Sequence, residues 1–230
     1  MTKILVIDTT SKHVSVGISF ENIIQTELNF INNNDLSKQI IPAIEFILGK
    51  VGLALREIDV VGVTVGPGFF TGIRIGLSTL KGLLVEVSKP IVPVISLKAL
   101  AWKLSSLTGY IVPLIDAKRE ELYVAGYQMN DSELKEFFPP SCLRVSSLLD
   151  RFDSPYPYFF VGNEIDQYRD ELKSRYKNAR FIQRSSYLAT EICQLTFHSF
   201  IRGEFITDLQ ELLPLYIRKP DAEMPPAKAT

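Results

Sequence analysis

Apolar residues gather in three short runs at the start of the chain, over residues 3–8, 13–19 and 22–30. The second run alternates apolar and polar positions, which is the pattern of a strand with one buried face. The first run ends on Asp8, and short polar stretches separate the three. This pattern predicts an antiparallel meander of three strands.

Helical spacing replaces alternation over residues 37–50. The apolar positions that show this spacing are Ile40, Ile41, Ile44, Ile47 and Leu48. Ser37 is a favourable N-cap residue, whereas Pro42 suits a first helical turn and marks an alternative start. The segment predicts a helix that begins at one of these two residues.

Strands and helices then alternate along the chain. Apolar runs predict strands at residues 59–66, 90–96 and 110–116. Helical spacing predicts a helix over residues 72–87 and another over 97–106, with Ser96 as its cap. The later part is less regular: it predicts a strand leading into a helix at 158–164, a strand at 179–183 and an amphipathic helix at 186–202. Residues 129–157 carry no motif, and the Pro-rich residues 218–230 predict an extended or disordered tail.

One pattern occurs twice. Residues 4–18 (ILVIDTTSKHVSVGI) align without gaps on residues 112–126 (VPLIDAKREELYVAG), so that Asp8 matches Asp116. Each copy is a strand that ends in Asp, a short polar turn and an alternating strand. The repeat predicts two lobes, residues 1–108 and 109–217, each opening with a β-hairpin.

Two such lobes resemble the actin-like ATPase (ASKHA) superfamily. The resemblance implies an α/β fold with mixed sheets flanked by helices, in which the hairpin turns face nucleotide phosphates and an Asp ends the first strand to hold the metal. The candidate nucleotide-binding residues are then Asp8, Thr9, Thr10 and Ser11. Asp8 has a second interpretation, as a strand-end residue that caps the hairpin turn.

The second hairpin turn differs in its chemistry from the first. Asp116 is followed by Ala117, Lys118, Arg119 and Glu120, so long charged side chains replace the hydroxyl groups. They would crowd a phosphate, although Lys118 or Arg119 has the charge to pair with one. Because phosphoryl transfer depends almost wholly on positioning, we predict that the chain does not hydrolyse ATP by itself.

The stretch GPGFFTGIRIG, residues 66–76, precedes the predicted helix 72–87. It is not a Walker loop, because Gly72 is followed by Ile-Arg, and Thr71 stands where a dinucleotide fingerprint needs its third glycine. An anion site at the helix N-terminus remains open, because free N–H groups point outward there. The adjacent Phe69 and Phe70 favour core anchoring or a partner surface.

The helix behind this loop has a continuous apolar seam. Its members, spaced 4, 3, 4 and 3 residues apart, are Ile73, Leu77, Leu80, Leu84 and Val87. Such a helix is either buried on all sides or packs one face on a partner. Gly72 and Gly76 leave room for another backbone to approach closely.

Composition narrows the function further. The 230 residues are 46% hydrophobic and 22% charged, with a formal net charge of −1, so no overall basic field attracts nucleic acid. No signal sequence or membrane-spanning run appears, and we expect a cytoplasmic protein. Cys142 and Cys193 lack a CxxC spacing and predict free thiols. His13 and His198 lie far apart, and neither a metal motif nor a GxSxG nucleophile is present, so no catalytic residue or metal ligand is assigned.

Four segments together resemble the bacterial TsaB family, also called YeaZ. In chain order they are ILVIDTTSKHVSVGI, GPGFFTGIRIGLSTLKGL, VPLIDAKREELYVAGY and LLPLYIRKPDAE, and the pattern GPGxFTGxRxG is the most specific. The resemblance implies a non-catalytic scaffold subunit that activates TsaD and, with TsaE, supports threonylcarbamoylation of the tRNA adenosine beside the anticodon. It also implies a homodimer in the absence of those partners, indirect contact with tRNA and no membrane association. Asp8 to Ser11 then form a vestigial phosphate cradle, with ATP or ADP and Mg bound only in the assembled complex.

The same resemblance places the subunit interface on the helix 72–87 and its loop. The interface residues are Gly66, Pro67, Gly68, Phe69, Phe70, Thr71, Gly72, Ile73, Arg74, Gly76, Leu77, Leu80 and Leu84. Two positions depart from the family pattern: Phe69 stands where members usually have Ser, and Leu36 where they often have His. A hypothesis of a different class is an autonomous actin-like ATPase or small-molecule kinase that uses Asp8.

Overall fold

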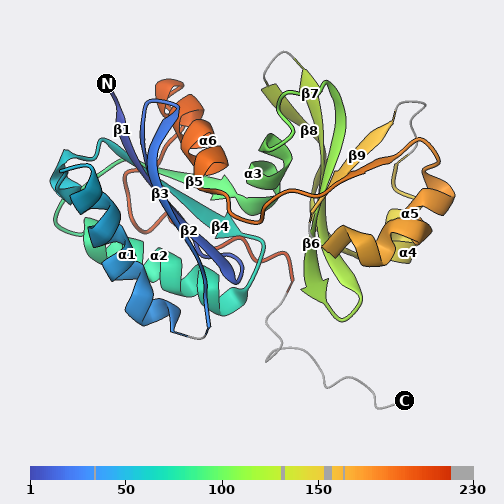
Figure 1. The fold of residues 1–230 in the computed structure, drawn as a ribbon, viewed down its shortest axis with the longest axis horizontal. Helices are drawn as coiled ribbons and strands as arrows, with labels where there is room; N and C mark the ends of the chain where they lie inside the picture. Colours follow the sequence, from blue (N-terminus) through green and yellow to red (C-terminus); the bar gives the residue numbers. More distant parts are fainter. Residues whose placement is uncertain (34, 131–132, 153–156, 163, 219–230) are drawn as a thin grey trace.

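The computed structural model describes residues 1–33, 35–130, 133–152, 157–162 and 164–218. Two five-stranded mixed sheets stand side by side in it, with helices between them and on their outer faces (Figure 1). The part of the predicted tail from residue 219 onward lies outside the described residues.

The first sheet has the strand order β3-β2-β1-β4-β5. Its strands are β1 (Lys3–Asp8), β2 (His13–Phe20), β3 (Ile23–Ile31), β4 (Val60–Gly66) and β5 (Ile91–Ile95). The first three are antiparallel, as the meander predicted, and β4 and β5 run parallel to β1. Helices α1 (Leu36–Lys50) and α2 (Phe70–Leu84) cover its outer face. A short 3-10 turn, η1 (Leu55–Glu57), lies between α1 and β4.

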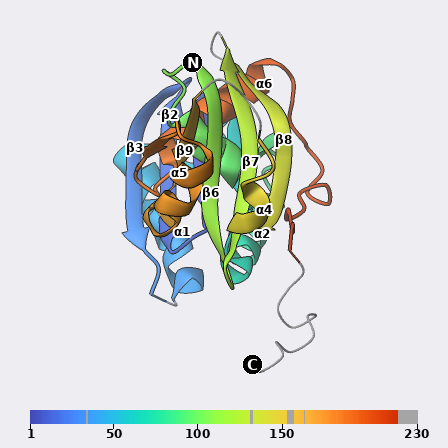
Figure 2. The same cartoon turned by 90° about the vertical axis from the view of Figure 1, so that its right-hand side faces the viewer.

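The second sheet repeats this order as β8-β7-β6-β9-β10. Its strands are β6 (Gly109–Lys118), β7 (Glu121–Asn130), β8 (Glu133–Arg144), β9 (Tyr158–Val161) and β10 (Arg180–Ile182). The outer face carries α4 (Val145–Leu148), η2 (Glu164–Tyr168) and α5 (Arg169–Arg175). Figure 2 looks onto this face, with α4 and α5 in front of the strands. Hairpins β1–β2 and β6–β7 open the two sheets in the same way, so the internal repeat correctly predicted a duplicated architecture.

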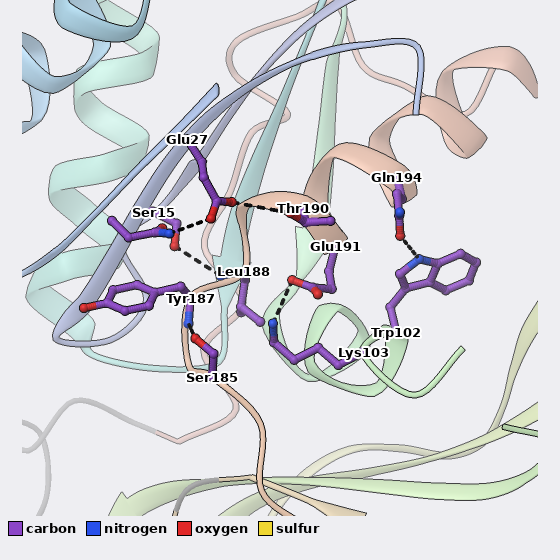
Figure 3. Close-up of polar contacts among 11 residues, drawn as sticks. Ser15, Glu27, Trp102, Lys103, Ser185, Tyr187, Leu188, Thr190, Glu191 and Gln194 are labelled. Atoms are coloured by element: carbon purple, nitrogen blue, oxygen red, sulfur yellow. Dashed lines mark hydrogen bonds and ion pairs between the residues drawn. The ribbon is translucent and has the colours of Figure 1, made fainter. Parts of the chain in front are cut away.

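Two helices fill the space between the sheets, α3 (Ser96–Trp102) and α6 (Ala189–Ile201). Figure 3 shows how α6 is attached: the N–H of Leu188, just before the helix, donates to Ser15 Oγ on β2 at 3.1 Å. On the α3 side, Lys103 pairs with Glu191 at 2.9 Å and Trp102 Nε1 donates to Gln194 at 2.7 Å.

The attachment of α6 corrects the lobe boundary. The repeat assigned residues 109–217 to the second lobe, but α6 packs its buried Ile192 and Cys193 on the first sheet, beside Ile4 and Val6. The chain therefore returns to the first lobe from about residue 188 onward. A repeat confined to the two hairpins carries no information about this crossover.

Several boundaries also differ from the prediction. Helix α1 begins at Leu36, before Ser37, and continues through Pro42. Ser96 lies inside α3 and its hydroxyl donates to Pro67 O at 2.5 Å, so it does not cap the helix as predicted. Helix α2 covers 70–84 and α6 covers 189–201, both displaced from the predicted ranges.

Strand β8 was not predicted, because Pro139 and Pro140 interrupt its pattern. Proline is tolerated there since β8 is an edge strand. Both cysteines are free, as predicted, with Cys193 buried and Cys142 half-buried. None of the helices in the described ranges is long and apolar enough to cross a lipid bilayer.

Candidate functional site: the first hairpin turn and the helix it packs on

Asp8 ends β1 and is fully buried. Its Oδ1 atom accepts three hydrogen bonds, from Thr10 N at 3.0 Å, Thr10 Oγ1 at 2.7 Å and Thr64 Oγ1 at 2.6 Å. Burial raises the pKa of this carboxyl above its ordinary value, while the hydrogen bonds from Thr64 and Thr10 act in the opposite direction. The contact with Thr10 N closes a turn across two residues, so Asp8 caps the hairpin turn, the second of its two interpretations.

The turn that Asp8 closes packs directly on the glycine-rich loop. A Cβ atom at Gly68 would overlap Thr10 O, one at Gly72 would overlap Thr9 O, and one at Gly76 would overlap Thr9 Oγ1. Phe69 N donates to Thr10 O at 2.7 Å. The glycines of GPGFFTGIRIG thus receive the backbone of the first hairpin, and the hairpin's own carbonyl takes the place that an anion would have at the start of α2.

The two sets of candidate residues therefore form one assembly. Sequence reasoning treated Asp8–Ser11 and residues 66–76 as separate sites, one for a nucleotide and one for a partner. The GxxxGxxxG spacing of Gly68, Gly72 and Gly76 was the available signal, because it marks a helix face that another backbone can approach.

The second hairpin faces the first across a small cavity. Residues of both hairpins line this cavity of about 150 Å³, among them Asp8, Ser11 and His13 from the first and Asp116 and Lys118 from the second. Lys118 is bound to its own turn: its N–H donates to Asp116 Oδ1 at 2.8 Å, and its Nζ lies 2.6 Å from Asp116 Oδ2. The side chain that was the best candidate for a phosphate already has an anionic partner.

Residues 118–120 add backbone strain at this turn. Lys118, Arg119 and Glu120 have φ values of 64°, 56° and 62°, in the left-handed region that few non-glycine residues adopt.

Among the described residues, no group of three or more His, Cys, Asp or Glu is placed to hold a metal ion.

The apolar seam of α2 faces the chain's own core. Ile73, Leu77, Leu80 and Leu84 are at most 4% exposed and pack against Leu5 and Ile7 of β1 and residues of α1. The expectation that these four side chains contact a partner is therefore wrong, and so is the same expectation for the buried Gly66, Pro67, Gly72 and Gly76. The spacing alone permitted both interpretations, because a core-facing stripe and a docking stripe have the same period.

The two phenylalanines of the loop have different environments. Phe70 stacks on Tyr216, with ring centroids 4.4 Å apart, and Arg74 lies 3.8 Å from the centre of the Phe70 ring. Arg74 Nε also donates to the Tyr216 hydroxyl at 2.9 Å. Phe69 is 48% exposed.

Exposed apolar side chains occur on α1 and directly after α2, two helices that pack side by side (Figure 1). Ile41 and Phe46 of α1 are 41% and 52% exposed, and Val85 follows α2 with 67% exposed. On α2 the exposed residues are Thr71, Arg74, Ser78 and Gly82. We call the exposed residues of α1 and α2, together with Val85, the α1/α2 surface. Sequence analysis did not single out Phe46, although its position off the apolar stripe of α1 could be seen in the sequence.

Comparison with known proteins identifies the family. A model of the TsaD family, described as tRNA N6-adenosine threonylcarbamoyltransferase, matches residues 31–224. The tRNA threonylcarbamoyladenosine biosynthesis protein TsaB of Bacillus subtilis is 26% identical over 222 residues, which cover 96% of each chain. The protein of the same name from Haemophilus influenzae is 31% identical over 139 residues, 59% of this chain and 58% of that protein.

The chain belongs to the TsaB family. The solved structure of YeaZ from Pseudomonas aeruginosa superposes with a TM-score of 0.80 at 24% identity, covering 94% of this chain and all of that one. Component A of the (R)-2-hydroxyglutaryl-CoA dehydratase from Acidaminococcus fermentans has a TM-score of 0.51 at 7% identity, over 88% of this chain and 99% of that one. These matches, together with the duplicated sheets, confirm the two-lobed actin-like fold.

Proposed function

We propose that this chain is a non-catalytic scaffold subunit that binds and activates a TsaD-like enzyme in threonylcarbamoylation of the tRNA adenosine beside the anticodon. The observation that carries the proposal is the packing of the Asp8 turn against the loop of α2. The backbone carbonyls of Thr9 and Thr10 pack against the start of α2, where a phosphate would bind, while apolar side chains on the two outer helices remain exposed.

The α1/α2 surface is the proposed docking site. Its exposed apolar side chains are Ile41, Phe46 and Val85. Their contact with water is unfavourable, so burying them against a partner would favour binding. Thr71 and Arg74 belong to this surface and Phe69 directly precedes α2, so all three keep their predicted interface role in this proposal. In the absence of a TsaD-like partner, a second copy of this chain would cover the same surface, and a TsaE-like ATPase would join the assembled complex. Contact with tRNA is then made through the partner.

Nucleotide use by the isolated chain does not fit the residues present. A magnesium ion requires an ionised carboxylate, whereas burial favours the neutral form of Asp8. Its Oδ1 is occupied by three donors, and its Oδ2, which has no hydrogen-bond partner among the described residues, is buried. The N-terminus of α2 is likewise occupied by Thr10 O. We propose that ATP or ADP with Mg binds only after assembly, where groups of a partner complete the site.

Reconstitution tests this function. A TsaD homologue should copurify with the chain, and tRNA modification by the TsaD and TsaE homologues should require it. The isolated chain should show neither magnesium–nucleotide binding by calorimetry nor ATP turnover. ATP turnover that is lost in Asp8→Asn would overturn the proposal in favour of an autonomous ATPase or kinase.

A further inference from the structure

The C-terminal segment 206–218, here called the strap, is bound to the first lobe along most of its length. Ile206 and Ile91 of β5 exchange two backbone hydrogen bonds, at 2.8 and 2.9 Å. Leu212 is fully buried in the core under α1 and α2, and Leu215 N donates to Val65 O at 2.8 Å. Tyr216 then joins the strap to α2 through Phe70 and Arg74.

The last described residue of the strap reaches the second lobe. Arg218 Nη1 donates to Ala117 O at 2.6 Å and lies 3.5 Å from Glu121 Oε2, so it contacts both sides of the β6–β7 turn. Its side chain is only 9% exposed, which makes this pair much less screened than a surface ion pair. Glu121 is itself fixed by the neighbouring strand, since Cys142 Sγ donates to it at 3.7 Å.

The strap also closes a hollow between the lobes. A groove of about 520 Å³ runs between the loop at residues 67–73, Lys12 of the first hairpin and Lys118 of the second, and residues 215–218 form one of its walls. Figure 1 shows the end of the described chain between the lobes, level with the two hairpin turns.

We infer that the strap is a clamp that holds the β6–β7 turn against the first lobe, with Arg218 as its interlobe contact and Tyr216 as its link to α2. Arg74 takes part in that link and is exposed on α2, so a molecule that binds Arg74 changes how firmly the clamp closes. This second consequence rests on the proposed docking of a TsaD-like enzyme; the clamp itself does not.

Hydrogen exchange on the isolated full chain tests the clamp. The reporter amides are Lys118, which donates to Asp116 within the β6–β7 turn, and Leu215, which donates to Val65. In Arg218→Gln both should exchange about tenfold faster, while strand β1 and the middle of β6, residues 111–115, exchange as in the wild type. Arg218→Lys keeps the positive charge but lacks the forked guanidinium group. Its two reporter amides should therefore exchange at rates between those of the wild type and of Arg218→Gln.

Arg202→Gln is the matched control. Arg202 pairs with Glu133 at 3.6 Å, but its side chain is 50% exposed. Glu133 lies beside Asn130, at the end of β7 opposite the β6–β7 turn. Arg202→Gln should leave both reporters unchanged. Wild-type exchange at both reporters in Arg218→Gln, or equal acceleration of every segment including β1, would overturn the clamp.

Affinity for a TsaD homologue then separates the clamp from the docking proposal. A several-fold change in Arg218→Gln supports the coupling, because the Arg218 side chain is only 9% exposed and is bound to Ala117 and Glu121 of the second lobe. If Arg218→Gln binds as the wild type does while Ile41→Glu binds weakly, docking stands and the coupling is refuted. If Ile41→Glu also binds normally, the docking proposal fails, and the exchange result still decides the clamp.

Discussion

The carbonyl oxygen of Thr9 occupies the space that a Cβ atom would take at Gly72. Thr9 belongs to the turn after β1, and Gly72 to the first turn of α2. This contact, with that of Thr9 Oγ1 at Gly76, makes the first hairpin and the outer helix a single rigid unit. The position of the α1/α2 surface is therefore set by the hairpin turn.

Replacing Gly72 tests this contact. Gly72→Ala forces a methyl group against a backbone carbonyl, which cannot rotate away, so we expect it to lower the free energy of unfolding by about 1–3 kcal/mol. Urea unfolding measures the change. Gly82→Ala is the control on the same helix: nothing lies within 4 Å of its added Cβ, and it should stabilise the protein by about 0.5–1 kcal/mol. Equal effects of the two variants would show that the Thr9 contact is not tight.

Local patterns predicted much of the fold. Alternation within β1 and β2 and its recurrence at residues 112–126 were sufficient for two hairpins and two lobes, because strand pairing across a short turn is local in sequence. The path of α6 was not predictable in this way. Its contacts with β1 join residues almost two hundred positions apart, and an apolar helix face does not specify which sheet it covers.

The local motifs of the candidate site were also predictable from the sequence, whereas their packing against each other was not. The glycine spacing and the Asp-Thr-Thr turn were recognised separately, but their mutual packing depends on tertiary structure. Phe70 was predicted to be a core anchor or a partner residue. Its stacking partner, Tyr216, is too distant in sequence for a local pattern to reveal it. The apolar seam of α2 is the clearest example. The sequence pattern shows that one side of the helix is apolar, but only the position of the first sheet shows that this side is buried.

Truncation of that seam distinguishes core from interface. Leu80 is fully buried, so Leu80→Ala should cost about 2–5 kcal/mol of unfolding free energy through lost burial and a residual cavity. Ser78→Ala, on the exposed side of the same helix, should change it by less than about 0.5 kcal/mol. A small effect at Leu80 in thermal or urea unfolding would contradict its place in the core.

The raised pKa of Asp8 makes stability depend on pH. The folded state holds its proton to a higher pH than the unfolded chain, whose carboxyl titrates near 3.8, so the unfolding free energy should fall as pH rises above that value. The loss stops once the folded carboxyl has also ionised. Asp8→Asn carries no titrating group, so its stability relative to the wild type should increase over this pH window and then stay constant. Urea unfolding at a series of pH values measures the difference, and parallel curves for the two proteins would refute the assignment.

The α1/α2 surface yields the most direct test of docking. Ile41→Glu places a charge on an exposed helical position, so the fold should be retained while affinity for a TsaD homologue falls tenfold or more, as at a typical interface hot spot of about 2 kcal/mol. Ile201→Glu is the matched control, because Ile201 is an equally apolar, exposed helical residue at the end of α6, on the other side of the first sheet. Calorimetric titration of both variants, with circular dichroism to verify folding, gives the comparison. If Ile201→Glu weakens binding and Ile41→Glu does not, the partner docks on the face of α6, and the outer helices are exposed for another reason.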